Sequence, residues 1–431
     1  MGKGELKKLS KDELIDIILK LRAELEKYKN PNTPSSSNKH LKPNTNGKKK
    51  KKGSKRGAPK GHKGTTRDQK PSRKSEIDAD ECPECGSQNL IDINIHKKIV
   101  EEVPEPELPE TVLYEIHEKQ CLDCGHTFMP ETNGIPKKGR FGVNIMILVV
   151  FLKFLLRGVL RRVVSFLMVG YALRMTPASV NTIINRVSQA ASTEYERIKT
   201  RVKAAPIVYV DETSFSVLGK NWWVWVFRTQ EDILLVIRDS RGSDVLKEIL
   251  TTHYSGIVVC DCWRAYNFFD RLQRCWAHLL RKAKKEKESR SGNNLYKKLK
   301  HLFKKIKRFN AGKNSKAQRE KKYKELTSEL ADIVKYYKRY DHLEGIIGYI
   351  SNNLGNWFTC IRYEGIEPTN NFAEQAIRET VVVRKIIGAF RSETGKDDYA
   401  TLASLIASWQ LKDFDLKAKL KEMLNRELCF S

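Results

Sequence analysis

Apolar residues follow different rhythms along the chain, and the changes of rhythm divide it into segments. Near the amino end, Leu14, Ile18, Leu21 and Leu25 recur at helical spacing, which predicts an amphipathic helix within residues 1–30. The rhythm is that of a short coiled coil. Docking of this helix on the rest of the protein is the alternative.

Residues 131–204 also show helical periodicity. It predicts two short helices, Arg161–Leu173 and Pro177–Ala190, with Thr176 as the cap of the second and Pro177 at its first position. The pair has the layout of a helix-turn-helix, and an ordinary helical hairpin fits equally well. In a helix-turn-helix, the residues facing DNA would be Ser179, Asn181, Thr182 and Asn185.

The period changes to that of strands after residue 205. Strands are predicted at 207–215, 221–229, 233–239 and 256–261, with a helix at 244–252 before the last of them. Three meandering strands, a helix and a further strand are the layout of a ribonuclease-H-like α/β core. The first part of this core spans 205–280, a Lys-rich helical insertion follows at 281–365, and 366–431 completes the core. The fold class is therefore multidomain α+β.

Three carboxylates stand where such a core would bring them together. Asp211 and Asp261 each follow a β-branched run, and Glu374 lies in a helical stretch beginning at Asn370. Carboxylate oxygens are the ligands that Mg²⁺ prefers, and Mn²⁺ uses the same type of ligand. Two such ions about 3.5–4 Å apart catalyse phosphodiester chemistry. The alternative is a coincidence of buried, hydrogen-bonded acids.

The net charge of the chain narrows the class of substrate that it can bind. The 431 residues carry a net charge of +28, a footprint for polyanions such as DNA, RNA or an anionic membrane surface. The most apolar stretch, Val143 to Leu156, contains Lys153 and is shorter than the ~20 residues needed to span a bilayer. The amino end has no signal-peptide core, so we expect a cytoplasmic, nucleoid-associated protein without a membrane partner.

Residues 31–75 are basic and almost free of apolar side chains. No core can form there, so the sequence predicts a disordered segment. A solubilising linker is one interpretation, and an arm that contacts DNA phosphates is the one we favour. The candidate contacts are Lys48, Lys49, Lys50, Lys51, Lys52, Arg56, Lys60, His62 and Lys63.

Two CxxC pairs, Cys82 with Cys85 and Cys121 with Cys124, lie within residues 76–130. Paired thiolates at this spacing share one tetrahedral Zn²⁺, and two pairs close the site. With two strands expected between the pairs, the pattern predicts a zinc ribbon. Four cysteines leave no open position, so this zinc would be structural.

The ordered set of motifs resembles the insertion-sequence-66 family of DDE transposases over nearly the whole chain. The motifs that carry the resemblance are Gly57 to Gly64, the two CxxC pairs, Gly139 to Gly142, Val210 to Thr213, Cys260-Asp261, Cys275 to His278, and Asn370 to Glu374 with its continuation to Gly395. The resemblance implies an integrase-like fold with Asp211, Asp261 and Glu374 as the metal-binding triad. It also implies DNA partners, namely the terminal repeats of an insertion sequence and target DNA.

In such an enzyme, Arg378, Arg384 and Lys385 would hold phosphates near the cleaved bond. Cys275 and His278 match a C-x-x-H motif that would orient the active-site region, and a buried cysteine beside a hydrogen-bonded histidine is the alternative.

A homodimer or larger assembly on DNA and accessory element-encoded proteins are further expectations from the resemblance. The chain departs from the family at Gln375 and at Cys262-Trp263, where the family usually has Arg and Gly-Tyr. Two rival functions stay open: a catalytically degenerate, DNA-binding regulatory protein, and a nuclease or resolvase on the same core.

Overall fold

The structure, a computed structural model, describes Ser10, Leu19 and residues 71–100 and 105–429. The predicted amino-terminal helix and the candidate arm contacts at residues 48–63 lie outside the described residues, Ser10 and Leu19 excepted. The described residues divide after Leu108 into two compact units. The larger one carries the sheet and all the helices discussed below.

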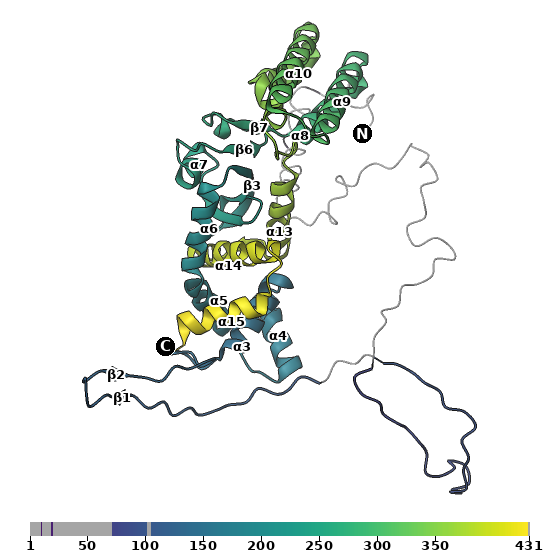
Figure 1. The fold of residues 1–431 in the computed structure, drawn as a ribbon, viewed down its shortest axis with the longest axis vertical. Helices are drawn as coiled ribbons and strands as arrows, with labels where there is room; N and C mark the ends of the chain where they lie inside the picture. Colours follow the sequence, from purple (N-terminus) through teal and green to yellow (C-terminus); the bar gives the residue numbers. More distant parts are fainter. Residues whose placement is uncertain (1–9, 11–18, 20–70, 101–104, 430–431) are drawn as a thin grey trace. The chain divides into compact units, whose positions relative to one another are not determined.

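A mixed sheet organises the larger unit (Figure 1), in the order β5-β4-β3-β6-β7 with β8 pairing with β3. Strands β3, β4 and β5 form an antiparallel meander, whereas β6 joins β3, and β7 joins β6, in parallel. This arrangement is consistent with the predicted ribonuclease-H-like core. The strands are β3 (Ile207–Val217), β4 (Lys220–Arg228), β5 (Ile233–Arg238), β6 (Ile257–Cys260), β7 (Leu272–Arg274) and β8 (Ala389–Phe390).

Helices occupy most of the remaining described chain. The segment before the sheet contains α3 (Val143–Val150), which runs on as a π-helix (Phe151–Leu155), then α4 (Leu160–Tyr171), α5 (Pro177–Ala190) and α6 (Ser192–Ala204). Helix α7 (Ser243–Leu250) connects β5 to β6. After the sheet come α8 (Trp276–Lys285), α9 (Arg290–Asn310), α10 (Lys316–Tyr337), α11 (Glu344–Ser351), α12 (Thr359–Arg362), α13 (Asn371–Ile387), α14 (Glu393–Leu411) and α15 (Leu416–Leu428).

Alternate side chains of β3 point to opposite faces of the sheet and pack in different hydrophobic cores. Val208 and Val210 belong to a core shared with α3, α5, α6 and α7, whereas Tyr209 and Phe215 belong to cores on the face where α13 packs. Successive side chains of a strand point to opposite faces. Asp211 therefore lies on the α13 face and Glu212 on the other.

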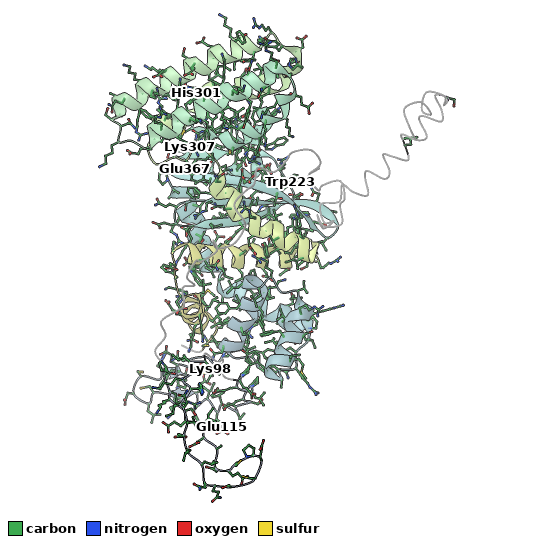
Figure 2. All side chains as sticks on the ribbon, turned by 90° about the vertical axis from the view of Figure 1, so that its right-hand side faces the viewer. Lys98, Glu115, Trp223, His301, Lys307 and Glu367 are labelled. Atoms are coloured by element: carbon green, nitrogen blue, oxygen red, sulfur yellow. The ribbon has the colours of Figure 1, made fainter. Side chains whose placement is uncertain are left out.

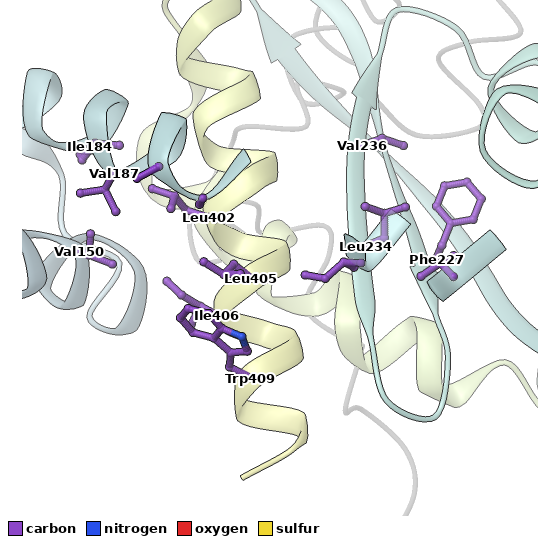
Figure 3. Packing of buried hydrophobic residues seen from close by; sticks show 14 of the residues in the cluster. Val150, Ile184, Val187, Phe227, Leu234, Val236, Leu402, Leu405, Ile406 and Trp409 are labelled. Atoms are coloured by element: carbon purple, nitrogen blue, oxygen red, sulfur yellow. The ribbon is translucent and has the colours of Figure 1, made fainter. Parts of the chain in front are cut away.

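Helix α14 packs between the early helices and the edge of the sheet. Figure 3 shows Leu402, Leu405 and Ile406 of α14 between Val187 of α5 and Leu234 of β5, all members of one buried core. Burying side chains of this size contributes about 1.5–3 kcal/mol each. This packing joins the helices before the sheet to the carboxyl-terminal segment.

Two serines of α14 complete the hydrogen bonding of edge strand β5. The Ser408 and Ser404 hydroxyl oxygens accept hydrogen bonds from the backbone N–H of Ile233 (2.9 Å) and Leu235 (2.8 Å). The match works because two strand residues advance about 6.6 Å and four helical residues about 6.0 Å. The outward edge of the sheet is thereby satisfied without another strand.

The helices of the insertion between β7 and α13 share one hydrophobic core with β3 and β6. Leu295 and Leu302 of α9 pack with Leu326 and Leu330 of α10, and all four side chains are fully buried. In Figure 2, His301 and Lys307 lie on this helical body, beyond the sheet that carries Trp223. The helical character predicted for 281–365 is confirmed.

The predicted core strands at 207–239 and 256–261 and the helix before the last are confirmed, as are two helices near 161–190. Thr176 caps α5 as predicted, since its hydroxyl accepts the Ser179 N–H at 3.1 Å. In the candidate reading face, Asn181 and Thr182 are exposed, whereas the Asn185 amide donates to Asp398.

The strands predicted between the two CxxC pairs are absent from the described residues 86–100 and 105–118. Instead, the two-residue strands β1 (Lys119–Gln120) and β2 (Thr127–Phe128) pair across the second CxxC turn. Ile91, Ile93 and Ile95 are exposed, so their apolar side chains have no buried face against which a strand would pack. Within the described part of the chain, no helix combines the length and apolar character needed to cross a membrane.

We predict that Ser404→Ala and Ser408→Ala each destabilise the protein, because each leaves a backbone N–H of β5 unpaired where α14 covers it. The free energy of unfolding should fall by about 1–3 kcal/mol per substitution. Urea unfolding followed by circular dichroism measures it. Ser165→Ala is the control, because the exposed Ser165 hydroxyl bonds only within its own helix. Equal effects at Ser165 and Ser404 would contradict this role of α14.

Candidate active site

Parallel pairing of β3 with β6 sets Asp211 beside Asp261. Ile207 pairs with Ile257 and Tyr209 with Val259. Continued for two residues beyond Tyr209, the same register places Asp211 opposite Asp261, which directly follows β6. Residues opposite one another in parallel strands point to the same face, so both carboxylates belong to the α13 face. Asp211 lies within β3 because that strand continues to Val217 along β4.

The third carboxylate comes from the first turn of α13. Asn370, immediately before that helix, is fully buried and ties three elements together. Its side-chain amide donates to the Val210 carbonyl of β3 at 2.7 Å, and its backbone N–H donates to the Cys275 Sγ at 3.1 Å. Glu374 lies one helical turn after Asn370, and its backbone N–H donates a hydrogen bond to the Asn370 carbonyl.

The charges of neighbouring carboxylates act on Asp211, which is also largely removed from solvent. The pKa of Asp211 is raised from 3.8 to about 7, first by burial, then by the charge of Glu212, and further by Asp261 and Glu374. The backbone N–H of Glu212 donates to Asp211 and opposes the rise. Without a cation, gathering these carboxylates is unfavourable.

Glu212 has a different role, on the opposite face of β3. Its carboxylate accepts a hydrogen bond from the Tyr266 hydroxyl at 2.6 Å and forms an ion pair with Arg241 at 2.8 Å. The Arg241 guanidinium in turn lies 4.6 Å from the ring centre of Trp223 and 4.2 Å from that of Trp263. These contacts hold the loop after Asp261 against the sheet.

Glu374 is surrounded by groups of α8. The Arg281 guanidinium lies 2.5 Å from Glu374 Oε1, and the His278 Nδ1 lies 3.6 Å from the same oxygen. Burial, followed by the charge of Arg281, lowers the pKa of His278, so the imidazole is neutral at neutral pH. The C-x-x-H motif therefore sits at the site.

Sequence reasoning missed two of these residues. Arg281 follows His278 by three residues, a helical spacing that places both side chains on one face of α8, which is a signal the sequence carried. Asn370 belongs to the motif Asn370 to Glu374, but its hydrogen bonds to β3 and to Cys275 depend on the tertiary fold.

Three basic residues of α13 were predicted to hold phosphates. Arg378 and Lys385 are exposed on this helix and free of ion pairs among the described residues. Arg384 is half buried and donates to the Thr213 hydroxyl at 3.0 Å and to Ser214. The structure thus places Arg384 against β3, on the strand that carries Asp211.

The donor set fits divalent metal ions. Three carboxylates from β3, the end of β6 and α13 supply only oxygen ligands, which suit Mg²⁺ or Mn²⁺. The Asn370 Oδ1 is buried without a hydrogen-bond partner among the described residues, which leaves a second type of oxygen available near the carboxylates. A bound cation would also relieve the repulsion that raises the pKa of Asp211.

The two CxxC turns have the same backbone geometry. Gly86 N–H bonds to the Cys82 carbonyl and Gly125 N–H to the Cys121 carbonyl, and both glycines have a φ of 71°. Backbone N–H groups, first those of Cys85 and Cys124, lower the pKa values of the Cys82 and Cys121 thiols. Each turn therefore favours thiolates, the form that binds metal. The turns fall in different compact units.

The departures from the family pattern leave the carboxylates in place. Gln375 is exposed on α13, and Cys262 is partly buried beside Asp261. The Trp263 N–H donates to Asp261 Oδ1 at 2.8 Å, and its indole donates to the Arg241 carbonyl.

A family model described as "Transposase IS66 family" matches residues 138–398. The match covers more than half of the chain and includes all three carboxylates, so the protein belongs to the IS66 transposase family. Membership implies a protein that binds and processes DNA. No curated protein matches the chain.

We predict that Asp211→Asn stabilises the protein in the absence of divalent ions. Between pH 4 and pH 7 folded Asp211 holds a proton that the unfolded chain releases, so the free energy of unfolding falls as the pH rises through this window. Above pH 7 the asparagine variant should exceed the wild type by on the order of 2 kcal/mol, and the difference should vanish below pH 4.

Thermal unfolding at pH 4, 6 and 8 measures this difference. Exposed Asp270 provides the control variant, Asp270→Asn. A stability gain that does not change with pH would mean that Asp211 is not the titrating group.

Proposed function

We propose that the protein is a DDE transposase that cleaves DNA at the ends of an insertion sequence and joins them to target DNA. The observation that carries the proposal is the register of β3 and β6, which sets Asp211 opposite Asp261, together with the anchoring of the start of α13, which carries Glu374, on β3. Family membership supplies the substrate class, since transposases act on DNA.

Asp211, Asp261 and Glu374 would hold two Mg²⁺ or Mn²⁺ ions. When bound, such ions activate the attacking oxygen and stabilise the leaving one. Water would be the first nucleophile and would release a 3′-hydroxyl at the element end. That hydroxyl would then attack a target phosphodiester in line, without a covalent enzyme intermediate.

The remaining residues position the substrate and the carboxylates. Arg378 and Lys385, exposed on α13, would bind phosphates flanking the cleaved bond. Asn370 and Arg384 fix α13 to β3, so that the position of Glu374 relative to Asp211 stays constant. Positioning of this kind supplies much of the catalysis in phosphoryl transfer.

Zinc would belong to the CxxC turns. The matching turns and the lowered thiol pKa values support one structural Zn²⁺ held by Cys82, Cys85, Cys121 and Cys124. The basic arm would add salt-dependent DNA affinity. Assembly as a dimer or larger oligomer on the terminal repeats, with accessory element-encoded proteins, completes the proposal.

The test uses purified protein and DNA ends taken from the sequence flanking its gene. With Mg²⁺ or Mn²⁺, we expect nicking at the ends and strand-transfer products. Asp211→Asn, Asp261→Asn and Glu374→Gln should each lower both steps by at least roughly a hundredfold. Asp270→Asn, outside the site, should retain them.

The outcomes separate the rival functions. Cleavage without joining would identify a nuclease or resolvase. Salt-sensitive DNA binding with no metal-dependent product, with companion proteins added as well, would identify a regulatory, catalytically degenerate protein. Full activity in Asp261→Asn would refute the assigned triad.

Zinc content tests the CxxC turns separately. Protein dialysed in Mg²⁺ buffer should retain about one zinc per chain, and Cys121→Ser should lose it because three thiolates leave the site open. Elemental analysis measures the content. The control is Cys262→Ser, which removes a partly buried thiol outside the turns. Unchanged zinc in Cys121→Ser would refute the four-cysteine site.

A further inference from the structure

We infer that Cys275, His278 and Glu374 form a second binding site, sharing Glu374 with the carboxylate triad, for a transition-metal ion of the Zn²⁺ type. A thiol sulfur, an imidazole nitrogen and a carboxylate oxygen from these residues all lie within 4.8 Å of one another. Among the described residues, this is the cluster in which three such ligand atoms meet.

Two helix starts build the cluster. Cys275 caps the amino end of α8, and His278 follows one helical turn later on the same face. Glu374 lies in the first turn of α13. The hydrogen bond from the Asn370 N–H to Cys275 Sγ, at 3.1 Å, fixes these two helix starts against each other. The ligands are therefore held by rigid elements.

The polar atoms at the site indicate a missing ligand. The His278 Nδ1, which faces Glu374 at 3.6 Å, is buried and has no hydrogen-bond partner among the described residues. Burying such an atom unpaired is unfavourable, and a metal ion would pair it. Backbone N–H groups of Asn370, His278 and Ala277 point at the Cys275 sulfur and oppose the effect of burial, which raises the pKa of this thiol, so that metal binding would release a proton from it.

Ligand chemistry selects the ion. A thiolate and an imidazole suit Zn²⁺ or Co²⁺, whereas Mg²⁺ takes oxygen ligands. With Zn–S near 2.3 Å and Zn–N near 2.0 Å, tetrahedral ligand atoms are about 3.5 Å apart. The side chains therefore need to close by about 1 Å. Three protein ligands leave the fourth position open to water.

Arg281 competes with the ion. Its guanidinium lies 2.5 Å from Glu374 Oε1 and 3.4 Å from His278 Nε2, and its side chain is 57% exposed, so it can turn away into solvent. Metal binding would replace Arg281 at Glu374. It would also withdraw Glu374 from the Asp211 and Asp261 carboxylates and so oppose Mg²⁺-dependent chemistry. That consequence alone rests on the proposed function.

The test is a Co²⁺ titration of the full chain after a single equivalent of Zn²⁺ has filled the four-cysteine CxxC site, which binds the ion more tightly than a site with three protein ligands. The wild type should bind one Co²⁺ with a sulfur-to-cobalt charge-transfer band and the visible bands of tetrahedral Co²⁺. Cys275→Ser should lose the charge-transfer band, and His278→Gln should weaken binding at least tenfold. Arg281→Ala should bind more tightly, because the competing cation is gone.

Three controls make the result specific. His301→Gln removes an exposed histidine of α9 and should bind like the wild type. Asp261→Asn should keep the charge-transfer band, since Asp261 belongs to the other site. Thermal unfolding shows whether each variant is folded, and His278→Gln decides the question if Cys275→Ser is not.

Wild-type affinity in His278→Gln would overturn the inference. So would loss of the band in Asp261→Asn, because the ion would then occupy the carboxylate triad. The readout is binding, so a failure here leaves the DNA-cleavage proposal intact. A failed cleavage assay likewise leaves this metal site intact.

Discussion

The parallel pairing of β3 with β6 is the constraint on which the candidate site depends. It sets two aspartates side by side on one face of the sheet, where both are partly buried. Burial, followed by the charges of neighbouring carboxylates, raises the pKa of Asp211. A sheet with a different register would separate the two carboxylates and remove the electrostatic reason to bind a cation.

Glu374 reaches this face through a chain of buried hydrogen bonds. Asn370 holds the start of α13 against both β3 and Cys275, and Arg384 holds a later turn of the same helix against β3. A helix fixed at two points cannot slide along the strand. These contacts explain how a glutamate that follows a long helical insertion is held against the strand that carries Asp211.

Glu374, in the first turn of α13, belongs to two sets of potential metal ligands that differ in the ions they prefer. On one side lie the Asp211 and Asp261 carboxylates, which suit hard cations. On the other lie the Cys275 thiol and the His278 imidazole, which suit softer ones. The Arg281 guanidinium forms an ion pair with the Glu374 carboxylate. If both proposed sites bind metal, competition for the Glu374 carboxylate would link them.

The sequence alone determined most of the helices and strands of the core and indicated the family. Period-two and helical patterns gave the strands of the core and the helices around them, because burial of one face imposes its period on the side chains. β-branched runs ending near Asp211 and Asp261 marked the carboxylates, and the ordered motifs indicated the family. Residues 86–100 and 105–118, between the CxxC pairs, contain no strand, and Ile91, Ile93 and Ile95 are exposed there.

Only the tertiary structure decided which groups meet. The register of β3 and β6, the anchoring by Asn370, the placement of Arg384 on β3 and the approach of Arg281 to Glu374 all join residues far apart in the chain. Local sequence fixes the period and direction of a side chain, but contacts between distant segments depend on how whole elements pack. The energy of that packing comes from contacts between residues far apart in the chain, so no short stretch of the sequence determines it.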